Sequence, residues 1–94
     1  MPQLYVYIIT TRRNKVLYTG VTRDLRKRVF QHRNGSIAGF SKRYNVGKLV
    51  FYEVFRDSYN AITREKQIKA GSRTRKETLI AAKNPEWRDL YNEL

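Results

Sequence analysis

Two short apolar runs near the start of the chain most constrain its fold. The stretches LYVYIIT (residues 4–10) and KVLYTGV (15–21) are rich in β-branched and aromatic residues, which favour strands. Only the polar residues TRRN (11–14) separate them. Two strands with so short a connection predict a β-hairpin.

Helix and strand patterns follow the hairpin. Leu25 and Val29 recur at helical spacing, and an Asn-Gly pair supplies a stop signal, which predicts a helix over residues 23–34. The segment SIAGFSKRYNVG (36–47) fits either a short helix or an ordered loop. The run KLVFYEVF (48–55) predicts a third strand.

Two further helix signals lie in the C-terminal part of the chain. The Asp-Ser pair at 57–58 can cap a helix over residues 59–70, which the following glycine ends. Thr74 and Glu77 have the spacing of a capping box just before an apolar run. Residues 84–94 begin with Asn-Pro, as a last helix or a turn would.

The charge balance points to a polyanionic partner. A chain of 94 residues cannot fill two hydrophobic cores, so we expect one domain over residues 1–94. Twenty Lys and Arg against eight Asp and Glu give a net charge of +12, and nucleic acid is the usual partner of such a surface. No segment fits the basic amphipathic helix that a membrane surface would favour.

The chain contains no cysteine, which excludes a disulfide framework and a thiolate zinc site. The start, MPQLYVYIIT, has no basic region before an apolar stretch and no run of about twenty apolar residues. We therefore expect neither a signal peptide nor a membrane span, and a cytoplasmic location.

Several tyrosines share one face of the predicted hairpin. Side chains alternate along a strand, so Tyr5 and Tyr7 point the same way in the first strand, as Tyr18 and Gly20 do in the second. Tyrosines on a strand are commonly packing residues with a wet hydroxyl, and Gly20 can mark tight packing or a bulge. Gly20 can also leave room for something to approach the backbone.

Two polar residues share a side of the first predicted helix with apolar ones. Arg28 and His32 fall on the side that Leu25 and Val29 define, and this side should face the sheet. An arginine there can simply lay its stem on the core, and a lone histidine is often structural. Their position also makes them candidate site residues.

Glu65 is the least expected residue of the predicted helix over 59–70. The apolar positions Ala61, Ile62 and Ile68 define one face, and Glu65 falls on that face. A half-buried carboxylate costs free energy unless a cation or hydrogen-bond donors compensate it. An arginine such as Arg28, a plain ion pair with another Lys or Arg, and a metal ion are all suitable partners.

Together these residues resemble the GIY-YIG endonuclease domain, from about Tyr5 to the end of the chain. The resemblance rests on YVY at 5–7, YTG at 18–20, Arg28 followed four residues later by His32, and Glu65 within TREKQIK. It is greatest to small stand-alone members of that superfamily, although a tyrosine stands where the family name has glycine. The resemblance implies an α+β fold, a small three-stranded antiparallel sheet flanked by α-helices.

The resemblance also implies an activity, a metal-dependent endonuclease that hydrolyses nucleic-acid phosphodiester bonds. Glu65 would hold Mg²⁺ or Mn²⁺, and Arg28 would clamp the phosphate. Tyr7 would be the leading general base, its phenol acidified by metal, arginine and the basic field. Tyr18 and His32 would orient the water or take part in proton transfer. Some members of the family also use an asparagine late in the domain; Asn84 is the nearest candidate, but its spacing from Glu65 does not fit well enough to carry the role over.

The remaining basic residues would hold the substrate by its phosphates, and DNA is favoured over RNA as that substrate. Specificity would come from a preference for a structure such as a flap, nick or branch, or from a partner protein. The residues expected to contact phosphates are Arg12, Arg13, Lys15, Arg23, Arg26, Lys27, Lys42 and Arg43. Two alternatives stay open, a non-catalytic basic module that binds DNA or RNA and a structural component of a ribonucleoprotein. In a pure binder, Glu65 would repel phosphate.

Overall fold

A three-stranded antiparallel sheet forms the centre of the computed structural model, which describes residues 3–35 and 46–94. The strand order is β2-β1-β3, with β1 (Leu4–Thr10) between β2 (Leu17–Thr22) and β3 (Lys48–Phe55). This confirms the predicted α+β class and the hairpin. Most of the segment 36–47, for which helix and loop were both open, lies outside the described residues.

The second strand begins two residues later than predicted because the hairpin turn is longer. The backbone N–H of Lys15 donates to the Thr11 hydroxyl at 2.9 Å, and Asn14 has a left-handed backbone with φ of 60°. Asparagine tolerates this conformation better than most residues. Lys15 therefore belongs to the turn.

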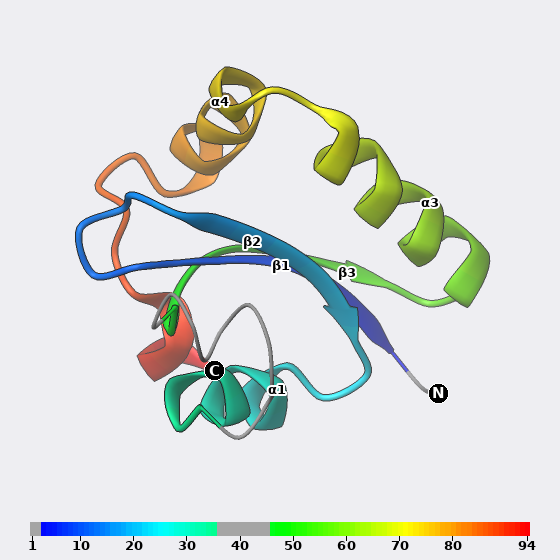
Figure 1. Ribbon diagram of the computed structural model, residues 1–94. Coiled ribbons are helices and arrows are strands. Elements are labelled where there is room, and N and C mark those ends of the chain that lie inside the picture. Colours follow the sequence, from blue (N-terminus) through cyan, green and yellow to red (C-terminus); the bar gives the residue numbers. More distant parts are fainter. Residues whose placement is uncertain (1–2, 36–45) are drawn as a thin grey trace.

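Helices cover both faces of the sheet (Figure 1). On one face lies α1 (Leu25–Arg33), and α3 (Ser58–Ala70) and α4 (Arg73–Lys83) lie on the other. A short 3-10 helix, η1 (Leu90–Glu93), packs on the α1 side. No helix in residues 3–35 and 46–94 is long and apolar enough to cross a membrane.

All three predicted helix starts differ from the observed ones, that of α3 by only one residue. Helix α1 begins at Leu25 and not at 23, because the Asp24 side chain accepts the Lys27 N–H and caps it. Ser72 caps α4, so the capping box predicted from Thr74 is wrong. Thr74 lies inside the helix, where its carbonyl accepts the Thr78 hydroxyl.

The period-two alternation of β1 separates two hydrophobic cores. Val6 and Ile8 face α3 and α4, where Ala61, Ile68 and Ile80 bury their side chains. Tyr7 and Ile9 face α1 and pack with a second set of residues. That second set comprises Leu25, Val29, Val46 and Leu49.

The C-terminal segment is held by a buried asparagine. Asn84 is 1% exposed, its amide group donates to the carbonyls of Val50 and Arg88, and its side-chain oxygen accepts the Arg88 N–H. All of these bonds join parts of the backbone, so Asn84 has a structural role. The predicted choice between helix and turn at 84–94 resolves as a turn followed by η1.

Candidate active site

The site is built around the hydroxyl group of Tyr7. Tyr7 lies on the central strand opposite Gly20 of β2, and a Cβ added to Gly20 would lie 2.6 Å from the Tyr7 Cζ atom. The register between β1 and β2 is continuous, which argues against a bulge at Gly20. The glycine therefore makes room for the tyrosine ring to cross the edge strand of the sheet.

His32 forms a hydrogen bond with Tyr7. The Tyr7 Oη atom lies 3.1 Å from His32 Nε2, and the histidine is 3% exposed. The Tyr18 ring adjoins both, with its centroid 6.4 Å from that of Tyr7 and 5.2 Å from that of His32. His32 Nδ1 is buried and has no hydrogen-bond partner in the described part of the chain.

The surroundings shift the pKa values of this pair in opposite directions. Burial, followed by the Tyr18 hydroxyl, raises the pKa of Tyr7 well above its usual value. Burial and then the Arg28 charge lower the pKa of His32 to about 4. The expected acidification of Tyr7 is therefore wrong for the protein's own groups, because burial outweighs Arg28. At neutral pH, His32 is uncharged, and its Nε2 accepts the Tyr7 hydroxyl proton in the tautomer that carries the ring proton on Nδ1.

Arg28 and Glu65 both act on the Tyr7 hydroxyl through their charges. Arg28 favours the ionised form of Tyr7 and lowers its pKa, whereas Glu65 raises it. These residues come from α1 and α3, on opposite faces of the sheet. Because Tyr7 reaches across the edge strand, groups from both faces can act on it.

Glu65 is buried where the sequence predicted, between Ala61 and Ile68 on the inner side of α3. Its partner is Lys69, whose Nζ lies 2.6 Å from a carboxylate oxygen, so the alternative of a plain ion pair holds and no bond to Arg28 is formed. The same Nζ lies 6.0 Å from the centroid of the Tyr18 ring. Ile62, which was predicted to lie on the buried face of this helix, is instead 42% exposed.

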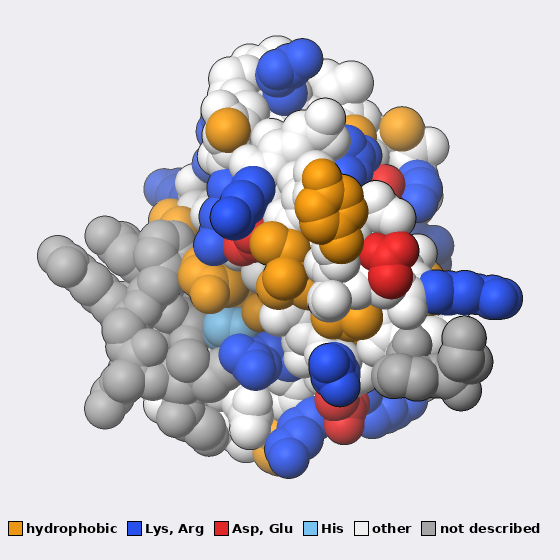
Figure 2. All heavy atoms as spheres, turned by 90° about the vertical axis from the view of Figure 1, so that its right-hand side faces the viewer, with side chains coloured by type: hydrophobic (Ala, Val, Ile, Leu, Met, Phe, Trp, Pro, Cys, Tyr) orange, Lys and Arg blue, Asp and Glu red, His pale blue; other side chains and the backbone are white. Residues whose placement is uncertain are grey.

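Arg28 lines a hollow of about 470 Å³ beside this edge. In the described ranges its guanidinium forms no ion pair, unlike that of Arg33, which binds Asp89. Basic side chains outnumber acidic ones on the face seen in Figure 2, where the pale blue histidine lies among basic and hydrophobic neighbours. The hollow is lined by Leu4, Val21, Thr22, Arg23, Asp24, Lys27, Arg28, Gln31 and Ile62.

The residues present fit a divalent ion held by one carboxylate. Within residues 3–35 and 46–94 there is no group of three or more His, Cys, Asp or Glu side chains that could hold a metal. Mg²⁺ commonly binds through one or two carboxylates, with water and substrate phosphate completing its coordination. Glu65 is such a carboxylate, and it already holds the positively charged end of Lys69.

The predicted phosphate contacts do not all lie together. Arg23 and Lys27 line the hollow beside Arg28, and their contact with phosphates stays a prediction. Arg26 instead bonds the Leu94 carbonyl and lies over the Tyr91 ring. Arg12, Arg13 and Lys15 lie in or beside the hairpin turn, and Lys42 and Arg43 lie outside the described residues.

Tyr5 does not join the site, although it shares a face with Tyr7. Its ring packs edge-on against Tyr52 with centroids 6.4 Å apart, and its hydroxyl donates to Gln3. Lys69 is a site residue that was not predicted, although its i+4 spacing from Glu65 could have indicated it.

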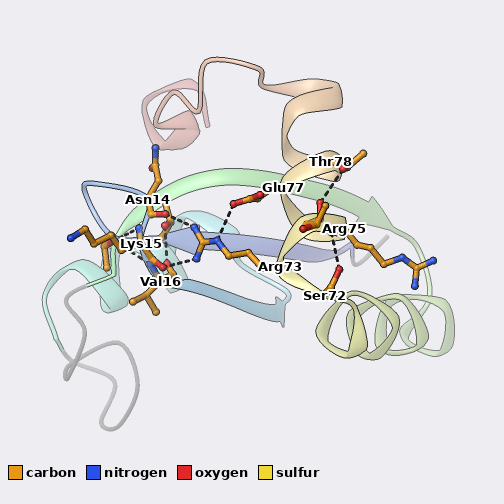
Figure 3. Close-up of polar contacts among 11 residues, drawn as sticks. Asn14, Lys15, Val16, Ser72, Arg73, Arg75, Glu77 and Thr78 are labelled. Atoms are coloured by element: carbon orange, nitrogen blue, oxygen red, sulfur yellow. Dashed lines mark hydrogen bonds and ion pairs between the residues drawn. The ribbon is translucent and has the colours of Figure 1, made fainter.

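Arg73 is a second residue that the sequence analysis missed. Its guanidinium donates to the backbone carbonyls of Asn14 and Lys15 and pairs with Glu77 (Figure 3). These contacts attach the hairpin turn to the start of α4. No local sequence pattern predicts these contacts, because Lys15 and Asn14 lie 58 and 59 residues before Arg73.

Comparison with known proteins gives consistent matches. The GIY-YIG catalytic domain matches residues 3–78. A UPF0213 protein of Clostridium perfringens is 39% identical over 90 residues, which cover 96% of each chain. A UPF0213 protein of Staphylococcus saprophyticus is 37% identical over 81 residues, 86% of this chain and 98% of that one.

A solved structure has a similar fold. The solution NMR structure of a UPF0213 protein from Bacillus halodurans superposes with a TM-score of 0.60 at 29% identity, covering 93% of this chain and 92% of that one. The domain match spans both tyrosine motifs, Arg28, His32 and Glu65. The chain therefore belongs to the GIY-YIG family, whose domains are generally those of nucleases.

Proposed function

We propose that this protein is a divalent-metal-dependent endonuclease that hydrolyses phosphodiester bonds, with DNA favoured over RNA. The observation that carries the proposal is the hydrogen bond between the Tyr7 hydroxyl and the uncharged His32, formed where the charges of Arg28 and Glu65 both act on that hydroxyl. An acceptor for a proton, a fixed cation and a carboxylate are the groups that this hydrolysis requires.

Tyr7 and His32 act as one base in this mechanism. Because burial raises the pKa of Tyr7, its phenolate is not available at neutral pH. The Tyr7 oxygen accepts a proton from the attacking water while its own proton passes to His32 Nε2, 3.1 Å away. The oxygen of the water forms the new bond to phosphorus, and the departing alkoxide takes a proton from solvent.

Arg28 and Glu65 would offset the negative charge of the reacting phosphate. Arg28 is permanently charged and can bond two phosphoryl oxygens at once, which stabilises the charge that grows on them. Glu65 is the residue that would hold Mg²⁺ or Mn²⁺. When bound, the ion supplies further positive charge against the phosphoryl oxygens.

The basic surface supports a substrate bound through its backbone. Arg23 and Lys27 adjoin Arg28 around the same hollow, so phosphates on either side of the reacting one can be held there. Such contacts give salt-sensitive binding with little sequence preference. Selectivity then comes from the structure of the nucleic acid, such as a flap, nick or branch, or from a partner protein.

A non-catalytic nucleic-acid-binding module is the second candidate, and one observation favours it. The ion pair with Lys69 cancels the charge of Glu65, so the carboxylate need not repel a phosphate. This weakens the original argument against a pure binder. A pure binding module, however, does not explain why the Tyr7 hydroxyl and His32 form a buried hydrogen bond.

Cleavage by the Glu65→Gln variant separates the two candidates. Purified wild type is incubated with supercoiled plasmid and with branched, nicked and single-stranded oligonucleotides, with Mg²⁺ or Mn²⁺ and with chelator. We expect metal-dependent cleavage that falls by at least about 10²-fold in Glu65→Gln. Binding, measured by fluorescence anisotropy, should persist in the variant.

The matched control is Glu77→Gln, which removes a carboxylate from an exposed ion pair on α4. Its cleavage rate should equal that of wild type. Cleavage that survives in Glu65→Gln would show that another site or a contaminant is responsible, and binding without any cleavage would establish the binding module.

A further inference from the structure

We propose that Lys69 is the resident counter-ion of Glu65, and that a divalent ion binds Glu65 only by displacing it. The inference rests on the proposed function, in which Glu65 is the metal-holding residue. It adds a switch to that site, because the free protein would hold Glu65 in a form that binds metal weakly.

The burial of Glu65 makes a counter-ion necessary. Its side chain is 11% exposed and lies between the apolar residues Ala61 and Ile68. A carboxylate in such a place is costly without a cation. Lys69 follows it by four residues on the same helix, an order that favours pairing, and its Nζ lies 2.6 Å from the carboxylate.

Lys69 is also able to leave. Its side chain is 51% exposed, and a long flexible lysine gives up a partner more easily than an enclosed one. Its Nζ lies 6.0 Å from the centre of the Tyr18 ring, so a released ammonium group remains at the edge of the site. A nucleic-acid phosphate would give it a new partner there.

This arrangement links metal and substrate. If a phosphate draws Lys69 away, Glu65 becomes free for the ion, and an ion on Glu65 releases Lys69 for a phosphate. By thermodynamic linkage, each ligand then raises the affinity for the other by the same factor. Lys69 thereby suppresses metal binding when no substrate is present.

The test measures Mn²⁺ binding to the protein alone, by the loss of the free Mn²⁺ signal in electron paramagnetic resonance. Lys69→Met removes the charge and keeps the stem, and Lys66→Met removes the same charge from an exposed position on the same helix. We expect Lys69→Met to bind Mn²⁺ about twofold to fivefold more tightly than wild type, as loss of a partly exposed ion pair predicts. Lys66→Met should bind as wild type does.

Unfolding by denaturant without metal gives a second measurement. Lys69→Met should have a lower midpoint than wild type, because Glu65 remains buried without its cation. The double variant Glu65→Gln/Lys69→Met should recover most of the loss, since an amide needs no counter-ion. A merely structural lysine would not produce this recovery together with tighter Mn²⁺ binding.

The contrary outcomes are distinct. If Lys69→Met and Lys66→Met bind Mn²⁺ equally while Glu65→Gln loses binding, Lys69 is not a competitor, and the metal site of the proposed function stands. If Glu65→Gln binds Mn²⁺ as wild type does, the metal role of Glu65 fails, and the inference about Lys69 fails with it.

Discussion

Two regions of this small protein differ in whether their polar side chains have bonding partners. At the hairpin and α4, the guanidinium of Arg73 has three acceptors, two of them backbone carbonyls. At the edge where α1 and α3 approach Tyr7, Arg28 has no ion-pair partner and His32 Nδ1 no hydrogen bond within the described ranges. Satisfied polar groups stabilise a fold, whereas an unpaired guanidinium that lines a hollow, as that of Arg28 does, is available to a ligand. The difference gives the first region a structural role and agrees with the function proposed for the second.

Replacing Arg28 should have the largest effect on activity. In Arg28→Ala we expect the cleavage rate to fall by about 10²- to 10³-fold, the usual loss when one donor to a developing oxyanion is removed. Arg28→Lys should not restore it, because an ammonium cannot bond two phosphoryl oxygens in one plane.

Arg75→Ala is the matched control, because it removes an equal charge from α4 on the other face of the sheet. We expect it to cleave within about twofold of wild type, since general charge loss weakens binding only modestly at saturating substrate. Equal losses in both variants would mean that Arg28 contributes only to the basic field.

The pH dependence of stability tests whether burial keeps His32 uncharged. The pKa of His32 is about 4 in the folded protein, below its ordinary value of 6.5. Between these values the unfolded chain binds more protons, so stability rises with pH there. We expect about 3 kcal/mol of unfolding free energy to be present above pH 6.5 and lost progressively as the pH falls towards 4.

Denaturant unfolding at a series of pH values tests this, with His32→Gln as the reference. Carboxylates also titrate in acid, but they do so in both proteins, so the difference between the two curves isolates the histidine. A difference that stays constant from pH 7 to pH 4 would show that His32 is not held uncharged by burial.

Much of the site follows from local periodicity. Alternation along β1 and β2 places Tyr7, Tyr18 and Gly20 on one face, and helical spacing places His32 opposite them, as observed. Arg28, on the same side of α1, is half-buried and lines the hollow at the edge of the sheet. The hydrogen bond between Tyr7 and His32 could not be predicted in the same way. It depends on how closely α1 packs on the sheet, which the burial of Leu25 and Val29 decides.

The wrong capping box reflects competition between similar local signals. Ser72 and Thr74 are both good helix caps, and α4 uses Ser72, whose hydroxyl accepts the Arg75 N–H. Tyr5 and Tyr7 likewise share a face, yet of the two only Tyr7 lies opposite a glycine. In both cases the two residues give equivalent local signals.

Replacing Arg73 should have the smallest effect, on stability and not on chemistry. We expect Arg73→Ala to lower the free energy of unfolding by about 1 kcal/mol, because its hydrogen bonds to Asn14 and Lys15 are made at a partly exposed site. The cleavage rate at saturating substrate should remain that of wild type. Arg75 forms no ion pair in the described part of the chain, so Arg75→Ala should change the free energy of unfolding by less than about 0.5 kcal/mol. If the two variants unfold alike, the contacts of Arg73 add nothing to stability, and satisfaction of polar groups would no longer distinguish the hairpin and α4 from the proposed site around Tyr7.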